Sequence, residues 1–157
     1  MNEPVPPSDA QRLAEAVARS MFERDRASQS LGMRIVDVGP GRAQVEMAIR
    51  DDMLNGHAFC HGGFIFSLAD SAFAFACNSY NLNTVASACN IDFVAPAHEG
   101  EVLTAMARER SASGRTGVYD IEVRNQRGEP IAFFRGKSYR IRGSIIEQAA
   151  HGTPGAD

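Results

Sequence analysis

One acidic residue lies inside a long apolar segment of the chain. Asp70 is the only formally charged residue between Asp52 and Asp92, and residues 61–77 around it include four Phe, one Ile and one Leu. Burying an ionised carboxylate without a partner is costly, and no Lys or Arg is near it in the sequence. We therefore interpret Asp70 as a candidate catalytic carboxylate whose pKa is raised by desolvation. The alternative is a structural carboxylate that caps a loop of the same chain.

The sequence His61-Gly62-Gly63 precedes this segment and is a candidate site for a polarised carbonyl oxygen. We predict that a helix begins here, and the first N–H groups of a helix have no acceptor within it. The helix dipole adds partial positive charge at this end. Such N–H donors stabilise an oxygen that gains negative charge during a reaction. Alternatively, the two glycines only permit close packing.

Gly62 and Asp70 cannot act on one carbonyl group from the same helix. Eight residues of α-helix span about 12 Å, so one carbonyl group does not reach both. If the two residues cooperate, two copies of the helix must face each other, with Asp70 of one subunit near Gly62 of the other. The spacing therefore predicts a dimer with two shared sites related by a two-fold axis.

Other polar residues near the predicted helix offer weaker chemistry. Asn55 could hold a water or a carbonyl, but it precedes a glycine, and Asn-Gly is a common turn. His57, Cys60 and His61 supply at most three zinc ligands, and no other Cys/His pair completes a set, so we predict no metal site. Cys60 as a thiol nucleophile is a weak hypothesis, and Ser67 lacks the G-x-S-x-G sequence of a serine hydrolase.

The basic residues of the chain gather in its C-terminal part. Residues 100–142 hold 9 Lys and Arg against 5 Asp and Glu, whereas residues 1–99 hold 7 against 12. This surplus is too small to indicate nucleic-acid binding. The cations on or beside the late strands either line a solvated sheet edge or anchor the phosphates of a nucleotide tail; they are Arg115, Arg135, Lys137 and Arg140.

The chain is predicted to be one α+β domain. Its 157 residues are enough for a single core, and a long helix on a six-stranded antiparallel sheet is expected. No signal peptide or membrane span is evident, and three cysteines do not form a disulfide framework, so a cytoplasmic protein is expected. The pattern predicts helices over 8–27 and 61–79, a loop over 51–60, and strands over 33–38, 42–49, 83–94, 101–111, 117–125 and 130–141.

An ordered set of motifs resembles the hotdog-fold acyl-CoA thioesterases, and within them the phenylacetic-acid-degradation branch. The motifs are Met53-Leu54-Asn55-Gly56-His57, Cys60-His61-Gly62-Gly63, Ser67-Leu68-Ala69-Asp70, Ala76-Cys77-Asn78-Ser79, Asn90-Ile91-Asp92-Phe93-Val94-Ala95-Pro96 and Thr116-Gly117-Val118-Tyr119-Asp120-Ile121-Glu122. The resemblance covers roughly residues 29–143. It therefore divides the chain into an N-terminal extension with a short helix (1–28), a hotdog domain (29–143) and a disordered tail (144–157).

The resemblance also implies a fold, an assembly and roles for residues. A long central helix is wrapped by a curved antiparallel sheet of five to six strands, and dimers with a continuous sheet pair into homotetramers. Gly62, helped by His61, polarises the thioester carbonyl. Asp70 of the partner subunit acts as general base or as nucleophile, and Asn55 positions water or substrate. The expected substrate-binding residues are Gly63, Ser87, Arg115 and Lys137. Coenzyme A is part of the substrate, so no separate cofactor is expected.

The sequence therefore favours a hydrolase for phenylacetyl-CoA or hydroxyphenylacetyl-CoA. Two alternatives stay open. A hotdog hydratase or dehydratase would use His61 and Asp70 as acid and base around the acyl chain. A non-catalytic acyl-CoA-binding subunit would tolerate loss of Asp70, although the chain has no DNA-binding helix-turn-helix that would favour a regulator. No nucleic-acid or membrane partner is predicted.

Overall fold

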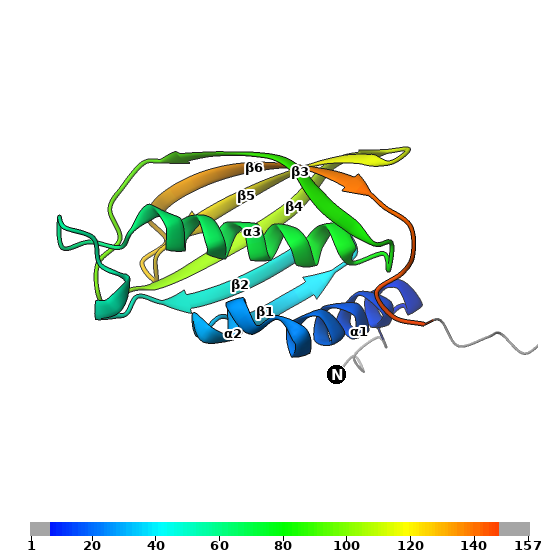
Figure 1. The fold of residues 1–157 in the computed structure, drawn as a ribbon, viewed down its shortest axis with the longest axis horizontal. Helices are drawn as coiled ribbons and strands as arrows, with labels where there is room; N and C mark the ends of the chain where they lie inside the picture. Colours follow the sequence, from blue (N-terminus) through cyan, green and yellow to red (C-terminus); the bar gives the residue numbers. More distant parts are fainter. Residues whose placement is uncertain (1–6, 148–157) are drawn as a thin grey trace, which may run out of the picture.

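A curved antiparallel sheet packs against one long helix, α3 (Gly62–Asn78), in the computed structural model, which describes residues 7–147 (Figure 1). The strands lie in the order β1-β2-β4-β5-β6-β3 and confirm the predicted α+β arrangement. They are β1 (Arg34–Gly39), β2 (Arg42–Ala48), β3 (Thr84–Phe93), β4 (Val102–Ser113), β5 (Thr116–Arg124) and β6 (Pro130–Arg140). The other helical elements are α1 (Asp9–Arg24), α2 (Arg26–Ser30) and the short 3-10 helix η1 (Asp51–Met53). None of the described helices is long and apolar enough to cross a membrane.

The long helix buries its sheet-facing side in the core. Phe73 and Phe75 of α3 are fully buried, and each such side chain contributes roughly 1.5–3 kcal/mol. The Phe73 ring lies against Gly136 of β6, where a Cβ would come within 2.7 Å of the ring, so the glycine allows helix and sheet to approach closely. At the C-terminal end of α3, the Asn78 side chain accepts from the Thr84 N–H at 2.9 Å and donates to the Thr84 carbonyl at 3.0 Å. These contacts fix α3 relative to the strands around it.

The N-terminal segment forms two helices where the sequence predicts one over 8–27. The Ser8 hydroxyl caps α1 by accepting from the Gln11 N–H of its first turn at 3.1 Å. The prediction of one helix is wrong at Asp25, whose side chain caps α2 by accepting from the Ser28 N–H at 2.9 Å. The Ser28 hydroxyl also lies 3.0 Å from the Ser71 hydroxyl. This contact joins α2 to α3.

Strand β3 forms one edge of the sheet and pairs only with β6 among the described strands. Most of its side chains are exposed. The ladder with β6 has a bulge between Ala86 and Ala88, which leaves Ser87 without a partner residue. An unpaired edge is a template for pairing with another chain, and a bulge redirects the side chain that it carries.

The residues after β6 dock on Asn81, although the sequence predicts a disordered tail from residue 144. The Asn81 side-chain oxygen accepts from the N–H groups of Ile145 and Ile146 at 3.0 and 2.9 Å, and its nitrogen donates to the Ile146 carbonyl at 3.0 Å. Asn81 is buried, so it satisfies three polar groups of the chain at once. The prediction is therefore wrong for Ile145 and Ile146, and residues 148–157 lie outside the described residues.

Candidate active site

An open, mostly apolar cavity of about 440 Å³ lies at the N-terminal end of α3. It is formed by the loop before the helix, the first turns of the helix, and the segment where β3 ends. Asn55 and Gly62 are among the residues that line it. The remaining lining residues are Phe59, Cys60, Ile65, Phe93, Val94, Ala95 and Pro96. Such a site can hold an apolar group while a few polar atoms fix its orientation.

The first N–H of α3 is a free donor at this cavity. Among the described residues, the Gly62 N–H has no hydrogen-bond acceptor, as expected for the first residue of a helix. The Gly63 N–H differs, because it donates to His61 Nδ1 at 2.9 Å. The prediction of two available glycine donors is therefore wrong for Gly63, which is committed to capping the helix. In neutral His61 the same bond places the proton on Nε2, so the exposed ring offers a second donor.

Asn55 is held so that its amide nitrogen is the free end. Its side-chain oxygen accepts from the His57 N–H at 2.9 Å, and its own N–H donates to the Phe59 carbonyl at 2.9 Å. These bonds close a tight loop in which Ala58 has φ 62°. The turn expected from Asn-Gly and the site role are therefore compatible, because the turn uses only the oxygen. The Nδ2 group remains available for a carbonyl oxygen or a water.

The thiol and hydroxyl candidates near the helix are engaged or unreactive. Burial raises the pKa of Cys60 to about 11, so it is a thiol at neutral pH and a poor nucleophile. The Ser67 hydroxyl donates to the Gly63 carbonyl at 2.8 Å. His57 stacks on Phe59, with ring centroids 5.5 Å apart. Within the described residues, no three His, Cys, Asp or Glu side chains are placed to hold a metal ion.

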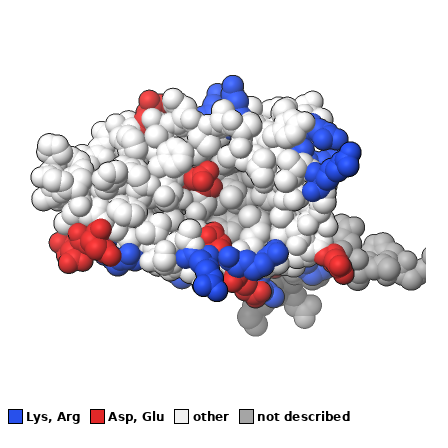
Figure 2. Space-filling model, in the orientation of Figure 1, with Lys and Arg blue, Asp and Glu red and all other residues white. Residues whose placement is uncertain are grey.

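Asp70 lies near the middle of α3. Its side chain is half-buried rather than buried, although apolar residues surround it in the sequence. Figure 2 shows few charged side chains over the middle of this face of the molecule, and Asp70 is the only charged residue of α3. Desolvation raises its pKa. Across residues 7–147, no side chain or backbone group hydrogen-bonds or ion-pairs with it.

Gly62 and Asp70 belong to one uninterrupted helix. The predicted separation of about 12 Å therefore holds for two residues of the same chain. Neither Asp70 nor any atom of its turn lines the cavity at Gly62. In the described residues of each chain, therefore, the Gly62 N–H has no carboxylate base beside it, and the Asp70 carboxylate has no N–H donor beside it.

The other predicted substrate-binding side chains lie outside the cavity. Ser87 is exposed at the bulge of β3, and its hydroxyl donates to the Lys137 carbonyl at 3.0 Å. Arg115 lies in the turn between β4 and β5, near the opposite end of α3, where it lines a small cavity of about 60 Å³ with Arg140. The Lys137 side chain is exposed on β6. Arg135 is committed elsewhere, because it makes two bonds to Asp120, at 2.6 and 2.8 Å.

The segment that forms one wall of the cavity has no role predicted from the sequence. Phe93 ends β3 and Pro96 follows it, and both line the cavity with Gly62. A large aromatic side chain at the end of an edge strand, close before a proline, is the signal that could have drawn attention to it. The contact with Gly62 joins residues far apart in the chain, and no local pattern predicts it.

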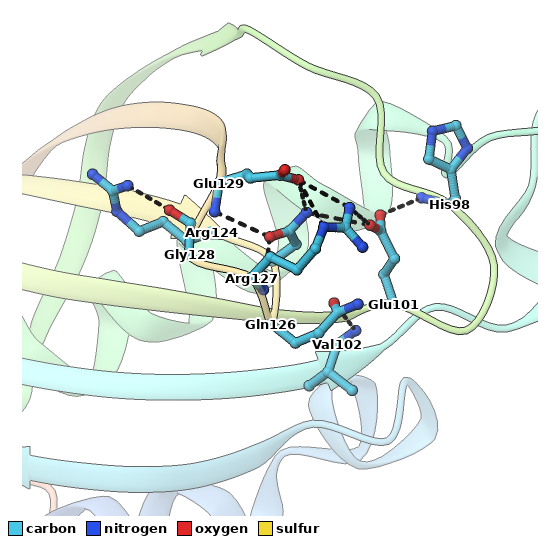
Figure 3. A network of polar contacts seen from close by, with 9 residues as sticks. His98, Glu101, Val102, Arg124, Gln126, Arg127, Gly128 and Glu129 are labelled. Atoms are coloured by element: carbon cyan, nitrogen blue, oxygen red, sulfur yellow. Dashed lines mark hydrogen bonds and ion pairs between the residues drawn. The ribbon is translucent and has the colours of Figure 1, made fainter.

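A second group of charged residues missed by the sequence reasoning holds the loop that follows this wall (Figure 3). The Glu101 carboxylate is only 8% exposed and accepts from the His98 N–H at 2.7 Å, Arg127 at 2.8 Å and Asn125 at 3.2 Å. Burial opposes its ionisation, but these donors outweigh burial and hold the pKa of Glu101 below its usual value. Within the same loop, the Ala97 carbonyl accepts from the Cys60 N–H at 2.7 Å. The network therefore supports the backbone beside the start of α3.

Comparisons with known proteins agree with this fold. The model of the thioesterase superfamily matches residues 57–132. The chain is 52% identical over 132 residues to the acyl-coenzyme A thioesterase PaaI of Escherichia coli, across 84% of this chain and 94% of that relative. The structure of the E. coli PaaI protein from the phenylacetic acid degradation operon matches with a TM-score of 0.86 at 49% identity, over 87% of this chain and 99% of the other. The TT0310 protein of Thermus thermophilus matches with a TM-score of 0.73 at 39% identity, over 75% and 99% of the two chains.

Proposed function

The chain belongs to the thioesterase superfamily and has its hotdog fold, and from this premise we propose that it hydrolyses acyl-CoA thioesters to the free acid and coenzyme A. Phenylacetyl-CoA and hydroxyphenylacetyl-CoA are the proposed substrates, in the degradation of phenylacetate. The names of the E. coli relatives support this choice. The observation that carries it is the free Gly62 N–H at an apolar cavity, eight residues along the same helix from the unpaired Asp70 carboxylate.

The donors at the start of α3 would bind the thioester carbonyl. The oxygen accepts from the Gly62 N–H, with Asn55 Nδ2 or His61 Nε2 as a second donor. Negative charge grows on this oxygen when the carbonyl carbon becomes tetrahedral, and each fixed donor of this kind is typically worth about 3 kcal/mol. The apolar walls strengthen these bonds because they exclude water. Gly63 supports the arrangement indirectly, since its N–H fixes the His61 ring.

The carboxylate would come from a second copy of the chain. The partner subunit's Asp70 takes a proton from water while the water oxygen bonds to the carbonyl carbon. Collapse of the intermediate breaks the carbon–sulfur bond, and the leaving thiolate takes up the proton. Attack by the carboxylate oxygen itself, through an anhydride that water then opens, is the other route. A carboxylate without donors is the stronger base or nucleophile, because no hydrogen bond stabilises its charge.

Assembly into dimers and then a homotetramer is part of this proposal. The free edge of β3 offers the surface on which two sheets can join. The largely uncharged face over α3 is suited to burial between copies (Figure 2). Exposed Arg115 and Lys137 would then hold the phosphates of coenzyme A, with Ser87 beside the reacting groups. A cytoplasmic location is proposed with this function.

Replacing Asp70 tests the proposed function. Asp70→Asn is nearly isosteric and should lose thiol release from phenylacetyl-CoA while still binding the ester, as measured with a thiol-reactive dye and by calorimetry. Asp9→Asn is the matched control, because that carboxylate is exposed on α1, far along the chain from the site. Wild-type rates in Asp70→Asn would overturn the mechanism. In the wild-type protein, hydration of crotonyl-CoA without thiol release, or binding of the ester without any turnover, would overturn the assigned reaction.

A further inference from the structure

Phe93 is the side chain that a Cβ on Gly62, the candidate oxyanion donor, would meet first. A Cβ built on Gly62 would lie 2.9 Å from Phe93 Cζ, 3.2 Å from Cε1 and 3.4 Å from Cε2. The tip of the ring therefore rests on the Cα of the residue whose N–H is free. This contact explains the absence of a side chain at Gly62 independently of the need for an exposed N–H.

The backbone holds Phe93 in place while leaving its ring half in solvent. Its Cα pairs with Ala132 of β6, and the next two N–H groups, of Val94 and Ala95, both donate to the Ile131 carbonyl, at 2.9 and 3.3 Å. Ala132 is buried on the side of the sheet that faces α3, so Phe93 projects to that side as well. The ring is nevertheless 52% exposed. A core residue would not be left so open, whereas a residue of a ligand cavity is.

The same glycine thus contacts both the aromatic ring and the expected carbonyl oxygen. A thioester whose oxygen accepts from the Gly62 N–H must place its acyl group beside the Phe93 ring. The rest of the cavity wall there is apolar, with Phe59 and Ile65 lining the same space. Aromatic rings prefer offset or edge-to-face contact with centroids 4.5–7 Å apart, and such pairs add binding beyond that of burial alone.

We infer that Phe93 is a specificity-determining residue, which selects aromatic acyl groups by ring contact and aligns their carbonyl on the Gly62 N–H. This inference rests on the proposed thioesterase function and assigns the acyl end of its substrate. It places the aryl group at the end of β3, in the cavity at the N-terminus of α3, and not in the small cavity beside Arg115.

The test compares two esters of similar size, phenylacetyl-CoA and cyclohexylacetyl-CoA, which differ in the aromatic ring. Phe93→Leu should lower kcat/KM for phenylacetyl-CoA about three- to tenfold relative to cyclohexylacetyl-CoA. Phe93→Tyr should keep the wild-type preference. Phe133→Leu is the matched control, because Phe133 is 41% exposed on the neighbouring strand but faces the other side of the sheet, and it should leave the ratio unchanged.

A binding measurement separates failure of this inference from failure of the proposed function. The ketone phenylacetonyl-CoA keeps the ring and a carbonyl but cannot be hydrolysed, and Phe93→Leu should weaken its binding about three- to tenfold relative to the cyclohexyl ketone. If Phe93→Leu loses the preference for the phenyl ketone over the cyclohexyl ketone, the role of Phe93 is supported even if the wild-type protein releases no thiol. Absence of thiol release would overturn only the thioesterase reaction. Equal losses for both rings, or none, would overturn the inference. Light scattering on each variant shows whether an equal loss arises from altered assembly.

Discussion

Asp70 and Glu101 are two carboxylates that the fold treats in opposite ways. Glu101 is the more buried, yet three donors surround it and hold its pKa below the usual value against burial. Asp70 is only half-buried but has no partner in the described chain, and desolvation raises its pKa. A satisfied carboxylate stabilises the structure around it, whereas an unsatisfied one keeps a reactive charge. Burial alone therefore does not distinguish the proposed catalytic carboxylate from a structural one; the lack of donors at a desolvated carboxylate does.

The largest expected difference between the two residues is in catalysis. Asp70→Asn should lower kcat for phenylacetyl-CoA by about 10²- to 10⁴-fold, the range for loss of a positioned base. Glu101→Gln should lower it less than about tenfold, because that side chain only supports the backbone near α3. Steady-state thiol release under saturating ester measures both. The comparison breaks if Glu101→Gln is as inactive as Asp70→Asn while remaining folded.

Thermodynamic stability should change in the reverse order. Glu101→Gln removes a charge on which donors converge, and should cost about 1–3 kcal/mol in the free energy of unfolding. Arg127 is 56% exposed, which places the cost toward the lower end because water can solvate the guanidinium. Asp70→Asn should leave stability at neutral pH unchanged or raise it, since it removes an unpaired charge. Urea unfolding followed by circular dichroism measures both, and a large loss in Asp70→Asn would assign that residue a structural role.

The pH dependence of stability should have opposite signs for the two carboxylates. The folded pKa of Asp70 is raised, so its stabilising contribution is complete below the unfolded value of about 3.9 and is lost as the pH rises through the folded value. The folded pKa of Glu101 is lowered, so its contribution is present above about 4.3 and is lost as the pH falls through the folded value. Melting temperatures from pH 3 to 7 test this. Relative to Asp70→Asn, the wild-type protein should lose stability as the pH rises. Relative to Glu101→Gln, it should gain stability as the pH rises.

The sequence predicts most of this fold because the fold follows local patterns. Each strand lies where alternation or turn signals place it, with ends within two residues of the prediction. The long helix follows from its apolar length and the glycines that precede it. The single N-terminal helix fails at Asp25, because a side chain that can cap a new helix is also acceptable within one.

The site is predicted less completely, because its contacts join distant parts of the chain. Gly62, Asn55 and Asp70 are evident from residue type and spacing. The contact between Phe93 and Gly62 is not evident, nor is the convergence of Asn125 and Arg127 on Glu101, which lies more than twenty residues earlier. In the sequence Glu101 is one more charge at the start of a strand, and only the tertiary structure distinguishes it from Asp70.

The smallest expected effect separates the donors that hold Glu101. Arg127→Gln removes an exposed cation, and its cost in the free energy of unfolding should be small and less than that of Glu101→Gln, because water solvates the guanidinium. The His98 N–H remains, and because it is the largest single cause that lowers the pKa of Glu101, the carboxylate should keep a lowered pKa. The stabilising contribution of Glu101 should therefore still be lost only at acidic pH. The free energy of unfolding against pH, compared between Arg127→Gln and the double variant that also carries Glu101→Gln, measures this. If the pH dependence disappears with Arg127 alone, ion pairing rather than backbone donation distinguishes Glu101 from Asp70.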